Sequence, residues 1–64
     1  MYSKYQPMNY YENMKKMVKK GMYPNAELME LKITNFVAEG LITVEQGNDL
    51  KVLLDKKENG ELDN

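Results

Sequence analysis

The sequence predicts an all-α domain of three short helices joined by glycine turns. Apolar residues recur at three- and four-residue spacing in three stretches of the 64-residue chain, a period typical of amphipathic helices. The first two stretches end at a glycine, and capping residues precede the second and third, as helix ends favour. We therefore expect a flexible N-terminus (1–7), a single helical domain (8–57) and a flexible acidic tail (58–64).

The first helix is predicted over residues 8–20. Its apolar residues share one face, formed by Tyr10, Tyr11, Met14, Met17 and Val18. Four lysines lie on the other side and gather toward the C-terminal end, namely Lys15, Lys16, Lys19 and Lys20. Positive charge is favoured there by the helix dipole. Gly21 follows directly and suits a left-handed C-terminal cap.

The second helix is predicted over residues 26–39. Pro24 disfavours helical geometry at the preceding residue, and Asn25 is a suitable N-cap. The main apolar stripe consists of Met29, Ile33, Phe36 and Val37. Leu28 and Leu31 fall outside this stripe and widen the apolar surface. Because such a helix usually contacts two neighbours, we expect the second helix to be the central one, ending at Gly40.

The third helix is predicted over residues 44–57. Thr43 and Gln46 have the spacing of a capping box, and Leu50, Leu53 and Leu54 face one way. Gly47 lies within this helix, where glycine costs about 0.5–1 kcal/mol relative to alanine. Either a neighbour approaches closely at Gly47, or the first turn of the helix frays.

A short sequence pattern occurs twice, once at the end of each of the first two helices. Residues 18–23 (VKKGMY) and 37–42 (VAEGLI) both place a glycine and two apolar residues after a helix. We expect each glycine to turn the chain and the following side chains to fix that turn to the core. Two copies do not indicate a solenoid.

The composition argues against an enzyme. Cysteine and histidine are absent, so disulfides, thiolate metal sites and the usual nucleophilic triads cannot be built. The only serine, Ser3, precedes the predicted helices. We expect no catalytic residues, no metal, no cofactor and no small-molecule substrate.

The same sequence contains no segment that would span a membrane. No apolar run approaches the roughly 20 residues needed to span a bilayer, and residues 1–7 lack the apolar stretch of a signal peptide. The absence of cysteine fits a reducing compartment. We expect a protein that is cytoplasmic, or part of something assembled in a cytosol, and that is not secreted by a signal peptide.

Two segments are similar to a known family. The run Gly21-Met22-Tyr23-Pro24, followed by residues 36–46 (FVAEGLITVEQ), resembles the small XkdX-like proteins of phages and prophages over about residues 10–47. The resemblance implies a phage or prophage origin and a non-catalytic accessory role in a virion or its tail region. It implies no site residues, because that family offers no catalytic residues to carry over.

We therefore expect a protein-interaction or structural module that binds a protein partner or a copy of itself. The chain has more apolar side chains than so small a core needs. The residues that we expect to contact the partner are Tyr10, Tyr11, Met14, Leu28 and Leu31.

Two alternatives follow from the uneven charge, which is +4 over residues 1–20 and −3 over residues 43–64. One is a regulatory binder that blocks a host protein through its acidic C-terminal half. The other is a nucleic-acid binder using the lysine face of the first helix. The chain has no arginine, the commonest reader of bases, so nucleic acid is the less expected partner.

Overall fold

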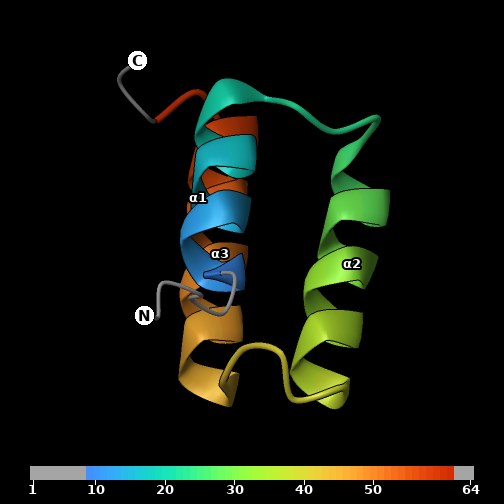
Figure 1. Ribbon diagram of the computed structural model, residues 1–64. Coiled ribbons are helices and arrows are strands. Elements are labelled where there is room, and N and C mark those ends of the chain that lie inside the picture. Colours follow the sequence, from blue (N-terminus) through green and yellow to red (C-terminus); the bar gives the residue numbers. More distant parts are fainter. Residues whose placement is uncertain (1–8, 62–64) are drawn as a thin grey trace, which may run out of the picture.

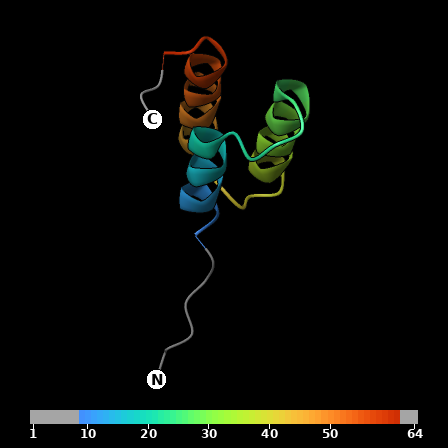
Figure 2. The same cartoon turned by 90° about the horizontal axis from the view of Figure 1, so that it is seen from above.

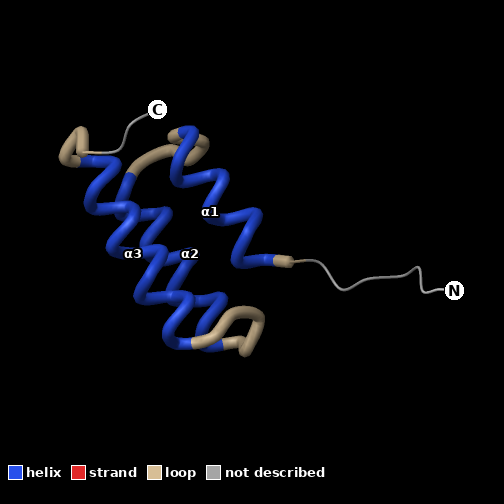
Figure 3. Tube along the Cα trace, turned by 90° about the vertical axis from the view of Figure 1, so that its left-hand side faces the viewer, coloured by secondary structure: helices blue, strands red, loops and turns tan. Residues whose placement is uncertain are grey.

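Three helices make up the described part of the chain, residues 9–61 of the computed structural model. They are α1 (Tyr10–Lys20), α2 (Ala26–Ala38) and α3 (Val44–Glu58) (Figure 1). The chain runs up, down and up, so α1 and α3 point the same way and α2 points the opposite way (Figures 1 and 3). The predicted all-α, three-helix class is confirmed. The segments predicted as flexible, 1–7 and 62–64, lie outside the described residues.

Each helix begins at a side-chain cap that the local sequence provides. Asn9, Asn25 and Thr43 accept hydrogen bonds from backbone amides three residues ahead, at 3.1, 2.8 and 3.0 Å. The predicted capping box is complete, because the Gln46 side chain accepts from the Thr43 amide at 3.0 Å. These bonds satisfy amides that would otherwise lack a partner. The Asn9 cap places the start of α1 at Tyr10. Residue 8, where the first helix is predicted to begin, lies outside the described residues.

Each helix ends in the same hydrogen-bonded turn. Gly21 and Gly40 have φ of 68° and 76°, left-handed values at which glycine avoids a steric penalty. The next residue donates back to a carbonyl five positions earlier, as Met22 does to Met17 and Leu41 to Phe36, at 2.8 and 2.9 Å. The repeated sequence pattern therefore encodes a repeated turn. The same turn closes α3, so residues 58–61 of the predicted tail belong to that helix and its cap.

The core is small and draws on all three helices. It consists of seven apolar side chains that are at most 5% exposed: Met14, Val18, Met29, Ile33, Ile42, Leu50 and Leu54. Ile42, from the turn before α3, fixes that turn to the core as the repeated pattern predicts. Within residues 9–61, no buried side-chain polar atom lacks a hydrogen-bond partner.

The central helix is α3, so the expectation that the second helix is central is wrong. α3 packs along both α1 and α2, whereas α1 and α2 contact one another only slightly. Seen from above, α2 stands to one side of the α1 and α3 pair (Figure 2). The sequence argument failed because Leu28 and Leu31 do not meet a second neighbour. They are 50% and 54% exposed.

The close approach of α2 to α3 occurs at Gly47. This residue is buried, and a Cβ atom placed on it would overlap the Cγ2 of Val37, with Ile33 Cγ2 only 3.8 Å away. A side chain at position 47 would therefore require the Val37 side chain or the two helices to shift. Of the two expectations for Gly47, the close neighbour is confirmed.

We predict that Gly47→Ala destabilises the domain by about 1–3 kcal/mol, because overpacking against Val37 outweighs the higher helix propensity of alanine. Urea denaturation followed by circular dichroism measures this. In a Val37→Ala background the same substitution should be neutral or stabilising. Stabilisation by Gly47→Ala in the unaltered chain would contradict the packing.

Candidate interaction surface

The structure separates the five predicted contact residues into internal and external groups. Met14 is 2% exposed and belongs to the core. Tyr10 and Tyr11 are half-buried and pack against the core. Leu28 and Leu31 are exposed, with exposed fractions of 50% and 54%. Of these five residues, only the two leucines therefore offer an exposed apolar surface; Met22, Val44 and Val52 are exposed elsewhere.

The two tyrosines of α1 hold the helices together. The Tyr10 ring meets Phe36 of α2 edge-on, with ring centroids 5.3 Å apart, a favoured aromatic geometry. The Tyr11 hydroxyl donates a hydrogen bond to the Asp49 carboxylate of α3. The Lys15 ammonium lies 5.3 Å from the centroid of the Tyr11 ring, within range of a cation–π contact. These contacts within the chain explain the positions of both tyrosine side chains, so no partner protein is needed to explain them.

A second tyrosine–carboxylate pair joins the α1–α2 turn to the end of α3. The Tyr23 hydroxyl donates to Glu58 Oε2 at 2.6 Å. Burial raises the pKa of Tyr23 to about 12, and the hydrogen bond and negative charge of Glu58 act in the same direction. The hydrogen bond to Asp49 likewise raises the pKa of Tyr11. Both pairs favour the neutral phenol in the folded protein.

Two carboxylates of the acidic C-terminal half take part in these pairs. Asp49 and Glu58 each accept a hydrogen bond from a tyrosine, so part of the net negative charge serves the fold. On α1, Lys16, Lys19 and Lys20 of the predicted lysine face are exposed, whereas Lys15 is half-buried. Their exposure is equally consistent with a solvated surface.

The two leucines belong to a longer stripe on the outer side of α2. Leu28, Leu31, Asn35 and Ala38 follow one another at alternating spacings of three and four residues, and all four are exposed. At about 3.6 residues per turn, this spacing places them on one side of the helix, opposite the buried Met29 and Ile33. We call these four residues the α2 stripe. No charged residue interrupts it.

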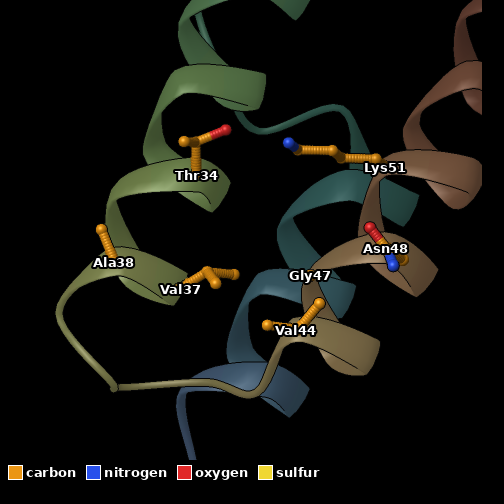
Figure 4. A pocket seen from close by; sticks show the side chains of 7 residues that line it. All are labelled: Thr34, Val37, Ala38, Val44, Gly47, Asn48 and Lys51. Atoms are coloured by element: carbon orange, nitrogen blue, oxygen red, sulfur yellow. The ribbon is translucent and has the colours of Figure 1, made fainter.

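An open groove lies between α2 and α3, beside the α2 stripe. It encloses about 310 Å³ and is lined by Thr34, Val37, Ala38, Val44, Gly47, Asn48 and Lys51 (Figure 4). Val37 points toward α3, whereas the Ala38 methyl group points away from it. The volume is at the lower limit of small-molecule sites, and Lys51 is the only ionisable lining residue. The lining offers no pair of groups for acid–base chemistry.

A smaller groove of about 200 Å³ runs between α1 and α2. Its lining consists of Tyr10, Asn13, Met14, Met17, Lys32 and Phe36. It exists because α1 and α2 each pack mainly on α3 rather than on each other. The aromatic contact of Tyr10 with Phe36 lies within this lining.

Two further properties concern residues 9–61 only. No three acidic side chains in this part of the chain gather into a group that could hold a metal ion. No helix among these residues has both the length and the apolar character needed to cross a membrane.

The chain matches no family model, no curated protein and no solved structure. The resemblance to XkdX-like proteins therefore stays a prediction. The evidence for function is the arrangement of the chain's own residues.

Sequence reasoning identified Leu28 and Leu31 but missed the rest of the α2 stripe. The signal was present, since Asn35 and Ala38 continue the spacing of the leucines by four and seven residues from Leu31. Neither Asn35 nor Ala38 is apolar enough to indicate an interaction surface by itself. The Tyr23–Glu58 bond had no local signal, because the two residues are 35 positions apart.

We predict that Tyr23→Phe reduces the loss of stability at alkaline pH. The folded-state pKa of Tyr23, about 12, lies above the unfolded value of about 10. The contribution of this phenol is therefore complete below pH 10 and is lost as the pH rises toward 12. Thermal melts of both proteins at pH 8 to 12 test this. Parallel losses in the two proteins would contradict the role given to Tyr23.

Proposed function

We propose that this chain is a small, non-catalytic protein-interaction or structural accessory module that binds through the outer side of α2. The observation that carries the proposal is the exposure of two adjacent leucines, Leu28 and Leu31, which face away from the core. Single exposed apolar side chains are common on protein surfaces. Adjacent ones that are rimmed by polar residues are typical of an interaction site.

Burial of the two leucines would supply part of the free energy of binding. Full burial of a leucine is worth about 1.5–3 kcal/mol. With half of each side chain still exposed, covering Leu28 and Leu31 would contribute about 1.5–3 kcal/mol together. That surface contributes nothing to the core, which the seven buried side chains form without it.

The resemblance over residues 10–47 supports a more specific setting. It favours a phage or prophage protein that acts in a virion or its tail region, in the host cytosol or incorporated in the particle. The elements that carry the resemblance are the two glycine turns at Gly21 and Gly40 and the segment between them. The proposed interaction role does not depend on this phage or prophage origin.

The proposal is tested by a photo-reactive benzoylphenylalanine placed at position 31 in cells that naturally express the chain. We expect a covalent protein adduct, identified by mass spectrometry, because a partner covers Leu31. The matched control is the same group at Glu30, which is exposed on the same helix but lies outside the α2 stripe. Equal adducts at both positions, or none at position 31, would overturn the proposal.

We also predict that Leu28→Lys and Leu31→Lys leave the free energy of unfolding within about 0.5 kcal/mol of the original value, as surface substitutions do. Leu50→Ala, in the core, should cost about 2–5 kcal/mol. Denaturant titration of the three variants provides the comparison. If either lysine variant loses as much as Leu50→Ala, these leucines serve the fold rather than a partner.

A further inference from the structure

We propose that the partner of the α2 stripe is the α2 stripe of a second copy, in a parallel two-helix pairing. This inference rests on the proposed interaction role and names the occupant of that surface. It draws on the spacing of the stripe, the position of one asparagine and the charges on either side.

The spacing of the stripe is that of a coiled-coil seam. Positions 28, 31, 35 and 38 correspond to a, d, a and d of the seven-residue repeat. In a parallel pair each residue meets its own counterpart across a twofold axis. The layers are then leucine on leucine twice, asparagine on asparagine, and alanine on alanine. The small Ala38 permits close approach at one end.

Asn35 favours the parallel arrangement over the antiparallel one. A single asparagine at an a position pairs with its counterpart and fixes the register of parallel coiled coils. An antiparallel pair would instead place Asn35 against Leu31 of the second copy and bury its amide without a polar partner. Leaving such a group unsatisfied is unfavourable.

The charges beside the stripe are complementary in the same arrangement. Glu27 occupies a g position and Lys32 the e position of the next repeat, and both are exposed. In a parallel pair, Glu27 of each copy reaches Lys32 of the other, which gives two ion pairs by symmetry. The Lys32 ammonium now lies 5.9 Å from the centroid of the Phe36 ring. It would exchange this exposed contact for the carboxylate.

The fold leaves room for a second copy. α2 stands beside the α1 and α3 pair (Figure 2), and the Ala38 methyl group points away from α3 (Figure 4). The stripe spans fewer than two heptads, so the contact belongs to the small, weak class of interfaces. Association is therefore to be measured up to about 1 mM protein, where a weak pair is populated.

Sedimentation equilibrium of charge variants tests the pairing. Glu27→Lys and Lys32→Glu should each weaken self-association roughly tenfold, because both ion pairs become repulsive. An equimolar mixture of the two variants should regain the original affinity, since each hybrid pair restores both attractions. Glu30→Lys, which makes the same charge change outside the stripe, should have no effect. Thermal melts confirm that all variants are folded.

Orientation is tested with single cysteines, which the chain otherwise lacks. Ala38→Cys should form a disulfide-linked dimer on oxidation, whereas Glu30→Cys should not. In an antiparallel pair, the two copies of position 38 would be about 15 Å apart, too far for a disulfide. Rapid oxidation at position 30 but not at position 38 would overturn the parallel pairing.

The outcomes separate this inference from the interaction role. A wild-type chain that stays monomeric to about 1 mM overturns self-pairing, while an adduct of another protein at position 31 would leave the interaction role intact. Self-association that Glu27→Lys does not weaken also overturns the pairing. The absence of any adduct at position 31 removes the interaction role itself.

Discussion

The contact between Gly47 of α3 and Val37 of α2 is the constraint on which the rest of the structure depends. Because position 47 carries no side chain, the Val37 methyl occupies the space where a Cβ would be. This approach lets α3 serve as the packing surface for both other helices. α1 then completes the core from the other side, through Met14 and Val18. A glycine that lowers the intrinsic stability of its own helix thus sets the distance between two helices.

The same arrangement explains why one side of α2 is free. Since α3 is central, α2 needs only one apolar side, and Met29 and Ile33 provide it. Leu28 and Leu31 consequently face solvent, where folding does not require them. The tyrosines, in contrast, contribute to the fold, because the hydroxyl groups of Tyr11 and Tyr23 donate hydrogen bonds to carboxylates of α3. Leu28 and Leu31 are thus part of the apolar surface that the fold leaves exposed, while Met22, Leu41, Val44 and Val52 are exposed elsewhere.

Local features of the sequence predicted the fold well. Helix ends are set by neighbouring residues, so Asn25, Thr43, Gly21 and Gly40 marked them within one residue. The central helix could not be predicted this way, because periodicity shows that a helix has a broad apolar surface but not what covers it. For the same reason Met14 was chosen as a contact although it lies in the core. Of the candidate site, residue type identified the two leucines. Asn35 and Ala38 continue their spacing in the sequence, but only the structure shows that all four are exposed.

The most direct test is a nuclear Overhauser measurement on the protein labelled with ¹³C and ¹⁵N. The packing of α2 on α3 predicts strong cross-peaks between the Gly47 α-protons and the Val37 methyl groups. It also predicts no intramolecular cross-peaks from the Leu31 methyl groups to α1 or α3, measured in dilute solution. The opposite result is weak or absent Gly47–Val37 cross-peaks together with contacts from Leu31 to a second helix. It would show that α2 is the central element. It would therefore contradict both the fold and the exposed surface derived from it.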